Sequence, residues 1–315
     1  MAAAVPHGTG WSLWTIGDVT WMRRSATCGT LPTLAEKRAV GTELADERFR
    51  GWLRGNLVRA AGHFGLTLVG EPVFGWRLRS ISAGARDQGH TRWLRVLSEQ
   101  PQWLPGEFWT GNADANIITE VAKPTVLATT EWDEHGCRRV RAELMTLMPG
   151  APASETDVLH TRPELVDSWW TELRRSLDVL GVTMTSRTHA DQAGVTTRIH
   201  ERFGGAVDST VTQWATVHGD VHWANLMSPR FAMLDWELWG RGPAGTDAAT
   251  LLCYSLPVPE VADTVRAAFA DVLDTPTGRV AQLAVIARLL RRVDGGDYPE
   301  LAQPLRELSD GLLGR

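Results

Sequence analysis

The chain has 315 residues, of which 43% are hydrophobic and 22% are charged, so it is long enough for two packed lobes and is not a mostly disordered protein. The net charge of −5 is uneven, because residues 1–150 carry 17 basic and 15 acidic side chains whereas residues 151–315 carry 15 and 22. An acidic second half favours a cationic small molecule as a partner and argues against nucleic acid.

The first 30 residues show no clear period, and we expect an irregular leader with a short strand at Trp11–Ile16. This N-terminus lacks the basic start and apolar segment of a signal peptide, and no apolar run is long enough to cross a bilayer. We therefore expect a cytoplasmic protein without a membrane partner. The three cysteines, Cys28, Cys137 and Cys253, are an odd number at wide spacing, which favours free thiols over a disulfide framework.

Residues 34–64 have the apolar spacing of helices, and Gly51 or Gly55 is the expected break between two of them. The period then changes to that of strands. Two glycine-containing turns separate three strands of an expected antiparallel meander. These strands run from Leu66 to Gly75, from Arg77 to Ala83 and from Thr91 to Leu97.

A short helix is expected from Glu107 to about Thr119. An alternating hairpin follows over residues 125–132 and 140–147, and it stops at Pro149-Gly150. This stop makes residues 147–151 the expected linker between two lobes. Beyond residue 162 the pattern is helical almost to the end, with expected helices over residues 165–180, 189–203, 248–254, 260–273 and 279–292.

The stretch Val217-His218-Gly219-Asp220 carries an aspartate on a glycine turn after an apolar residue. Asn225 stands five positions after Asp220, and a second apolar run ends at Asp235, ten positions after Asn225. Kinase-type phosphoryl transfer requires a carboxylate that takes a hydroxyl proton, together with an amide and a second carboxylate that hold magnesium through oxygen. The spacing therefore predicts a phosphoryl-transfer site, with Asp220 as the catalytic residue and Asn225 and Asp235 as ligands of Mg²⁺.

Together with Leu234-Asp235-Trp236-Glu237, this stretch resembles the aminoglycoside phosphotransferase and choline kinase-like family. The catalytic loop of that family reads His-Gly-Asp-x-x-x-x-Asn, and its metal motif begins Ile/Leu-Asp-Trp/Phe-Glu. The resemblance covers about residues 65–255 and implies an α+β, bilobal protein kinase-like fold. It places an amino lobe with a helical extension at 1–147, whose nucleotide-binding antiparallel sheet spans about 65–147, and a mainly helical carboxy lobe with the catalytic loop and substrate site at 148–315.

The resemblance also implies the nucleotide contacts. Arg95 occupies the strand position of the family's phosphate-binding lysine, and the two lysines of this chain, Lys37 and Lys123, lie elsewhere. An arginine binds phosphate oxygens through its fork, but its shape and reach differ from those of lysine, and a solvated strand arginine is the alternative interpretation. Glu107 and Asp114 are both candidates to pair with Arg95. The backbone of Thr146, Leu147 and Met148 is expected at the adenine edge.

Two residues near the motif are expected to support the catalytic loop structurally. His218 resembles the family histidine whose ring binds backbone near the metal motif, and Asp247 resembles a later aspartate that braces the loop from the next helix. Contact with the acceptor is expected from His222 and from carboxylates of the helical lobe, each of which is alternatively an ordinary surface acid. These carboxylate candidates are Glu237, Glu260 and Asp263.

The resemblance implies an ATP- and Mg²⁺-dependent phosphotransferase that moves the γ-phosphate to a hydroxyl of a small molecule. The acidic second half suits polycationic sugars, and the preference for arginine over lysine suggests a GC-rich bacterial genome, so an antibiotic of aminoglycoside type is the first expectation. A small-metabolite kinase of the choline, homoserine or sugar type is an alternative. If Arg95 does not replace the lysine, a nucleotide-binding pseudokinase without transfer activity is another.

The same stretch also matches a sequence motif of a different enzyme class. Gly219-Asp220-Val221-His222 matches the Gly-Asp-x-His of dinuclear metallophosphoesterases. Asp133-Glu134-His135 supplies their early Asp-x-His in form, but Gly111-Asn112 is followed by alanine where those enzymes need histidine. Two metal ions would therefore lack ligands, and this alternative is disfavoured.

Overall fold

The computed structural model describes residues 11–16, 19–24, 42–103, 106–134 and 136–315. The described chain divides into two compact units. The first contains the described residues up to Trp109 together with Pro124–Leu147, and the second contains Thr110–Lys123 and Met148–Arg315. The chain thus passes from one unit to the other between Leu147 and Met148, but residues 110–123, which we expected in the amino lobe, belong to the second unit.

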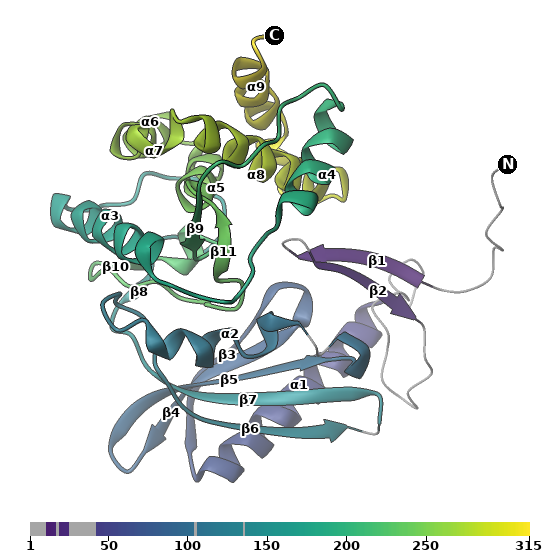
Figure 1. Ribbon diagram of the computed structural model, residues 1–315. Helices are drawn as coiled ribbons and strands as arrows, with labels where there is room; N and C mark the ends of the chain where they lie inside the picture. The colour runs from purple at the N-terminus through teal and green to yellow at the C-terminus, as the bar shows by residue number, and fades with distance from the viewer. Residues whose placement is uncertain (1–10, 17–18, 25–41, 104–105, 135) are drawn as a thin grey trace, which may run out of the picture. The chain divides into compact units, whose positions relative to one another are not determined.

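The first unit contains a five-stranded antiparallel sheet in the order β3-β4-β5-β7-β6 (Figure 1). The meander and the later hairpin predicted from the sequence are confirmed, and a bulge between Val69 and Val73 interrupts the first strand pairing. The predicted strand at Trp11–Ile16 is also present as β1, and it pairs with β2 (Val19–Arg24). The strands of the sheet are β3 (Thr67–Phe74), β4 (Ser80–Asp87), β5 (His90–Glu99), β6 (Val126–Glu134) and β7 (Arg138–Thr146).

One face of this sheet is covered by helix α1 (Thr42–Phe64) (Figure 1). The prediction of two helices broken near Gly51 or Gly55 is wrong, because both glycines lie inside this continuous helix; residues 34–41 lie outside the described part. Glycine costs a helix interior about 1 kcal/mol, but Leu53 and Leu57 are buried against the sheet and together contribute several kcal/mol. Packing therefore outweighs the local preference.

The expected helix from Glu107 to Thr119 is likewise wrong. The segment forms three short pieces, namely η4 (Glu107–Trp109), α2 (Gly111–Asp114) and η5 (Ala115–Ile117). At Gly111 an added Cβ would lie 2.5 Å from the backbone oxygens of Trp236 and Glu237. This close approach requires glycine and fixes α2 against the loop that carries the predicted metal motif.

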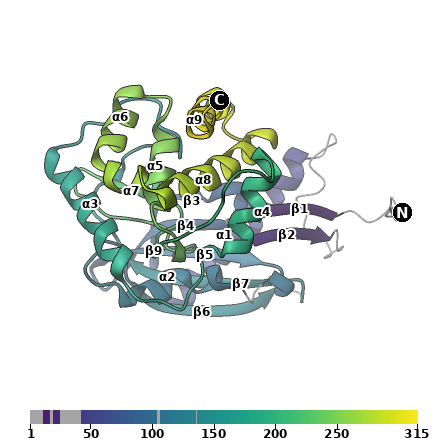
Figure 2. The same cartoon turned by 45° about the horizontal axis from the view of Figure 1, so that its top comes forward.

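The second unit is mainly helical. Its helices are α3 (Asp167–Val182), α4 (Gln192–Phe203), α5 (Thr246–Ser255), α6 (Pro259–Ala268), α7 (Ala270–Leu273), α8 (Pro276–Asp294) and α9 (Ala302–Leu313). The helix predicted over 260–273 is two helices that separate at Phe269, and α9 was not predicted. Helix α5 is buried along its whole length, and α8 lies alongside it, as Figure 2 shows. Thr275 caps α8 by accepting a hydrogen bond from Gly278 N, and Pro276 occupies its first turn.

Two short antiparallel ribbons of the second unit flank the stretch from His218 to Asp235. Strand β9 (Trp214–Val217) pairs with β11 (Gly240–Pro243), and β8 (Ala151–Pro152) pairs with β10 (Met227–Ser228). Hence Asp220 and Asn225 both lie between β9 and β10, and Asp235 lies between β10 and β11.

The structure also bears on membrane-spanning helices and on the state of the cysteines. Across the described residues, no helix is both apolar enough and long enough to span a membrane. The prediction of free thiols holds for Cys253, which is buried, but is wrong for Cys137, which is disulfide-bonded. Cys28 lies outside the described residues. Wide spacing along the chain does not measure separation in the fold, which is why the sequence argument failed at Cys137.

Candidate active site

The turn that carries Asp220 depends on a glycine. Strand β9 ends at Val217, and Gly219 then adopts φ 85°, a left-handed conformation that side chains other than glycine rarely accept. A Cβ at this position would also lie 2.3 Å from Nδ1 of His189. His189 is held by a 2.9 Å hydrogen bond between Nδ1 and Leu238 O, and burial lowers its pKa to about 4, so this neighbour is a fixed neutral ring.

We expect Gly219→Ala to destabilise the protein by about 1–3 kcal/mol, because the left-handed backbone disfavours alanine and the new methyl group meets the His189 ring. Chemical denaturation measures this loss. Gly181→Ala is the matched control, since Gly181 lies in α3 with nothing within 4 Å of its Cβ position and alanine should be neutral or stabilising there. Equal stability of both variants would contradict the assigned backbone role.

Asp247 and His218 hold the backbone of the same turn. The Asp247 carboxylate accepts hydrogen bonds from His218 N and Gly219 N, each of 2.8 Å. Burial raises the pKa of Asp247 to about 6, and these two amides oppose that shift. His218 is fully buried, which lowers its pKa to about 4, and its neutral ring donates from Nε2 to Leu234 O and accepts at Nδ1 from Asp220 N. One histidine therefore links the Asp220 turn to the segment that carries Asp235.

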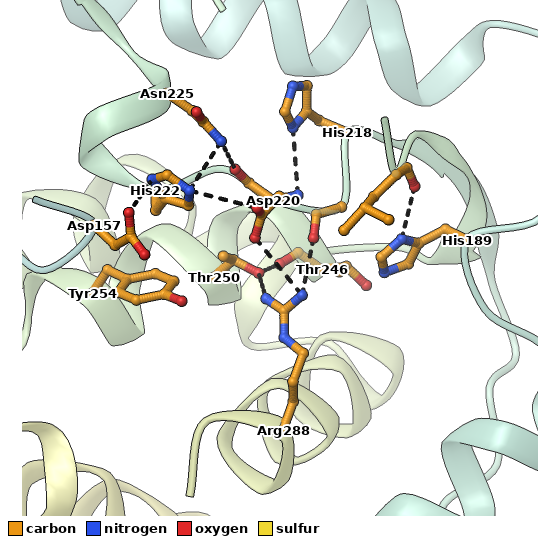
Figure 3. Close-up of polar contacts among 12 residues, drawn as sticks. Asp157, His189, His218, Asp220, His222, Asn225, Thr246, Thr250, Tyr254 and Arg288 are labelled. Carbon is orange, nitrogen blue, oxygen red and sulfur yellow. Dashed lines mark hydrogen bonds and ion pairs between the residues drawn. The ribbon is translucent and has the colours of Figure 1, made fainter. Parts of the chain in front are cut away.

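The Asp220 side chain lies in a cationic environment and remains 23% exposed. Its Oδ2 is 3.4 Å from His222 Nε2, and its Oδ1 is 3.9 Å from Arg288 Nη1 (Figure 3). Burial raises the pKa of Asp220, but His222 and Arg288 outweigh burial and hold this pKa well below its usual range. The carboxylate is consequently ionised, with no proton on either oxygen.

Arg288, on α8, braces the turn from below in the view of Figure 3. Its side chain is 8% exposed, and it donates to Gly219 O at 3.1 Å and to Thr250 Oγ1 at 3.3 Å. Arg288 was not predicted from the sequence, because a helical pattern does not show which residue, over 60 positions upstream, an inward-facing arginine contacts.

Asn225 is oriented by its amide nitrogen. Nδ2 donates to Asp220 O at 3.0 Å and lies 3.0 Å from His222 Nε2, which directs Oδ1 to the other side of the amide. With a neutral ring, His222 accepts this bond and its Nδ1 faces Asp157 Oδ1 at 3.5 Å. Burial lowers the pKa of His222, but Asp220 and Asp157 raise it by more. With a protonated ring, Nε2 donates toward Asp220, and the Asn225 amide is then oriented by its hydrogen bond to Asp220 O alone.

Asp157 connects this cluster to two tyrosines that the sequence analysis also missed. It accepts a hydrogen bond from Tyr298 OH, and Arg292 Nη1 donates to Tyr298 OH at 3.1 Å and to Tyr254 OH at 3.4 Å. Asp157 and Tyr298 are 141 positions apart. No local pattern in the sequence joins residues at that separation.

The segments that carry the two predicted metal ligands, Asn225 and Asp235, are hydrogen-bonded to each other. Leu234 N donates to Asn225 O at 2.8 Å, which ties the residue before Asp235 to Asn225 itself. Asp235 has φ 56°, a left-handed conformation. The amide oxygen of Asn225, which the two contacts of Nδ2 do not use, and a carboxylate oxygen form a donor set suited to a hard divalent cation, so these residues fit magnesium. No cluster of three or more His, Cys, Asp or Glu that could hold a metal occurs in the described ranges, although a dinuclear phosphoesterase needs one.

The predicted acceptor carboxylates are distributed differently. Glu237 is 7% exposed and its backbone oxygen accepts from Arg187, so it is built into the loop after Asp235. Glu260 and Asp263 lie on the exposed side of α6, where Asp263 pairs with Arg266 at 3.2 Å. Among the described contacts, neither of the two α6 acids joins the network around Asp220, whereas His222 is part of it.

In the first unit, Arg95 is not a solvated strand residue. Its side chain is 12% exposed, and its Nη1 lies 3.7 Å from Oε2 of Glu143, which stands directly opposite on β7. Asp114 is not its partner, because Asp114 binds Arg187 and Thr110. Glu107 lies in η4. Glu143 was missed because cross-strand register is not visible in a single sequence.

Glu143 also connects Arg95 to neighbouring charges. Arg141 Nε lies 3.0 Å from Glu143 Oε1, and Arg141 Nη1 lies 2.7 Å from Glu131 Oε1. The face of β5, β7 and β6 opposite the one that α1 covers thus carries alternating charges, and Arg141 and Glu143 are buried there. At the end of β7, Thr146 N donates to Thr125 O, so this amide is already bound within the first unit.

No protein-family model and no curated protein sequence matches this chain. Solved structures do match. The aminoglycoside phosphotransferase APH(4)-Ia is 13% identical with a TM-score of 0.54, and the alignment covers 82% of this chain and 98% of that chain. The amicoumacin kinase hAmiN is 14% identical with a TM-score of 0.50, covering 82% and 93%. A putative aminoglycoside phosphotransferase from Ralstonia eutropha JMP134 is 15% identical with a TM-score of 0.50, covering 84% and 96%.

Identities of this size establish the fold and nothing finer. The antiparallel sheet, the mainly helical second unit and the catalytic stretch between β9 and β11 all lie within it. The chain therefore has the protein kinase-like fold found in aminoglycoside phosphotransferases, as the sequence predicted.

Proposed function

We propose that the protein is an ATP- and Mg²⁺-dependent phosphotransferase whose acceptor is a hydroxyl of a small molecule. The observation that carries the proposal is the arrangement of three groups on this fold. Asp220 is ionised and partly exposed, the amide nitrogen of Asn225 donates to Asp220 O and so leaves the amide oxygen on its other side, and Asp235 follows a residue that is hydrogen-bonded to Asn225. These are the groups that phosphoryl transfer requires.

The proposed chemistry uses each group once. The acceptor oxygen attacks the γ-phosphorus, the bond from that phosphorus to the β–γ bridging oxygen breaks, and ADP leaves. The acceptor proton passes to the Asp220 carboxylate, which the Asp247 and Arg288 contacts to the turn hold in place. Bound Mg²⁺, held by Asn225 and Asp235, would offset the charge of the phosphate oxygens.

For the acceptor, we propose an antibiotic of aminoglycoside type. Structures similar to this chain include APH(4)-Ia in a ternary complex with ADP and hygromycin B, and hAmiN with AMP-PNP, Ca²⁺ and Ami. The acidic composition of residues 151–315 is consistent with a cationic compound. A small metabolite such as choline, homoserine or a sugar is the second candidate, since the same three groups would serve any hydroxyl.

The direct test is Mg²⁺-dependent ADP formation by the purified protein with hygromycin B, amicoumacin, choline, homoserine and hexoses, each confirmed by mass spectrometry of the phosphorylated product. We expect one acceptor class to stimulate ADP formation at least tenfold over the acceptor-free rate, and Asp220→Ala to remove the stimulation. Nucleotide binding without stimulation by any acceptor would instead favour the pseudokinase.

Substitution of Arg95 provides a second test that distinguishes an enzyme from a pseudokinase. Its guanidinium is preorganised by Glu143, and if it binds phosphate oxygens, Arg95→Ala should raise the KM for ATP by about tenfold or more, whereas Arg95→Lys should recover part of the loss. Initial rates at varied ATP measure this. Arg139→Ala is the control, because Arg139 pairs with Glu131 and Asp133 at the more exposed end of β7. An unchanged KM in Arg95→Ala would show that Arg95 does not bind the nucleotide.

A further inference from the structure

The segment that contains α2 is attached to the loop that follows Asp235. Trp236 N donates to Asn112 Oδ1 at 2.8 Å, and Trp239 Nε1 donates to Gly111 O at 2.9 Å. Gly111 itself leaves no room for a Cβ against the backbone of Trp236 and Glu237. Segments about 125 positions apart are thus in direct contact. One of these hydrogen bonds is made by the backbone of Trp236, the residue that immediately follows Asp235.

Arg187 fastens the same two segments from the other side. It is 8% exposed, and its Nη1 lies 2.6 Å from Asp114 Oδ2 at the end of α2. Its Nε donates to Trp239 O and its Nη2 donates to Glu237 O, each at 3.1 Å. One buried guanidinium therefore bridges α2 and two carbonyls of the Asp235 loop, a fork geometry that lysine does not reproduce.

The held loop contains a strained residue. Asp235 has φ 56°, and a residue with a side chain stays in the left-handed region only where its surroundings fix it. The hydrogen bond from Trp236 N to Asn112 fixes the peptide that directly follows Asp235. The Arg187 contacts fix the peptides that follow Glu237 and Trp239.

We infer that Asn112 and Arg187 form a clamp that positions Asp235 as a metal ligand. The Asn112–Arg187 clamp acts through the backbone of residues 236–239, so Asn112 and Arg187 are positioning residues and not nucleotide contacts. In the sequence analysis this segment was expected to supply a carboxylate to Arg95; instead Asp114 binds Arg187 within the second unit. The inference rests on the proposed function, because it assigns Asp235 to metal binding.

Two measurements on the full-length chain test the clamp. Hydrogen–deuterium exchange over residues 234–239 reports whether the loop is held, and electron paramagnetic resonance of Mn²⁺ with AMP-PNP reports metal affinity. We expect Asn112→Ala and Arg187→Gln to speed exchange at 234–239 and to weaken Mn²⁺ binding about tenfold, the lower end of the effect of removing groups that orient metal ligands. Asn112→Asp should recover both, since its carboxylate still accepts from Trp236 N.

The matched control is Arg175→Gln. Arg175 donates to Glu120 O and so attaches the other end of the same segment, away from the Asp235 loop. We expect this variant to bind Mn²⁺ as the unmodified protein does. The clamp is overturned if Asn112→Ala and Arg187→Gln leave exchange unchanged, or if they speed exchange without changing Mn²⁺ affinity. If the unmodified protein binds no Mn²⁺ with AMP-PNP, the proposed function fails first, and the clamp loses its metal role with it.

Discussion

Asp220→Asn is expected to lower kcat by about 10²- to 10⁴-fold, the range that a positioned general base contributes. The substitution keeps the size of the side chain and removes its charge and its ability to take a proton. The surrounding turn should survive, because it is held through backbone groups that Asp247 and Arg288 bind and not through the Asp220 carboxylate. Acceptor-dependent ADP formation measures kcat, and calorimetry with AMP-PNP measures nucleotide binding.

Nucleotide affinity in Asp220→Asn should stay within about threefold of the unmodified protein, since the proposed role of Asp220 begins at the acceptor hydroxyl. Asp178→Asn is a suitable control, because Asp178 is an exposed acid of α3 that pairs with Arg174 in the same unit. A variant at Asp220 that keeps most of its turnover would refute the assignment of the base. A loss of nucleotide binding equal to the loss of turnover would move Asp220 to the cofactor.

Asp235→Asn should have a different profile, with a large loss in Mg²⁺-dependent nucleotide binding as well as in turnover. Asparagine tolerates the left-handed conformation that Asp235 adopts at φ 56°, so this substitution removes the charge with little added backbone strain. We expect at least a tenfold weaker affinity for AMP-PNP in the presence of Mg²⁺ and a much smaller change in its absence. Calorimetric titrations with and without Mg²⁺ give both numbers.

The comparison between the two variants is sharper than either alone. Asp220→Asn should separate turnover from binding, whereas Asp235→Asn should reduce both. If Asp235→Asn binds AMP-PNP equally well at all Mg²⁺ concentrations, Asp235 is not a metal ligand, and the proposed division of labour between the two aspartates is wrong. Thermal melts in the absence of ligand check that each variant remains folded.

Several features of this protein follow from short-range patterns. The hairpin at 125–147 and the helices around 165–203 were predictable because alternation with period two and apolar spacing with period 3.6 are local properties. Likewise, the spacing of Asp220, Asn225 and Asp235 predicted a phosphoryl-transfer site, because all three residues lie on two successive loops, between β9 and β10 and between β10 and β11. Site residues that lie on neighbouring loops have a spacing that can be recognised in the sequence.

The failures share a physical reason. Gly51 and Gly55 were expected to break a helix that packing on the sheet keeps intact, and Glu107–Thr119 was expected to be one helix although the loop after Asp235 draws Gly111 into close contact. In both cases tertiary contacts outweigh local preference by a few kcal/mol. Cys137 was expected to be free because separation along the chain was used as a measure of separation in space.

By itself, the sequence determined the fold class and the three residues on which the proposed chemistry depends. Only the tertiary structure decided which groups surround them. Arg288, Asp157 and Arg187 reach the Asp220 turn and the Asp235 loop from helices and loops dozens of residues away, and Glu143 reaches Arg95 from the neighbouring strand. A side chain's local pattern encodes whether it faces inward, but its partner is set by the packing of whole elements, and that information is absent from any short stretch of the chain.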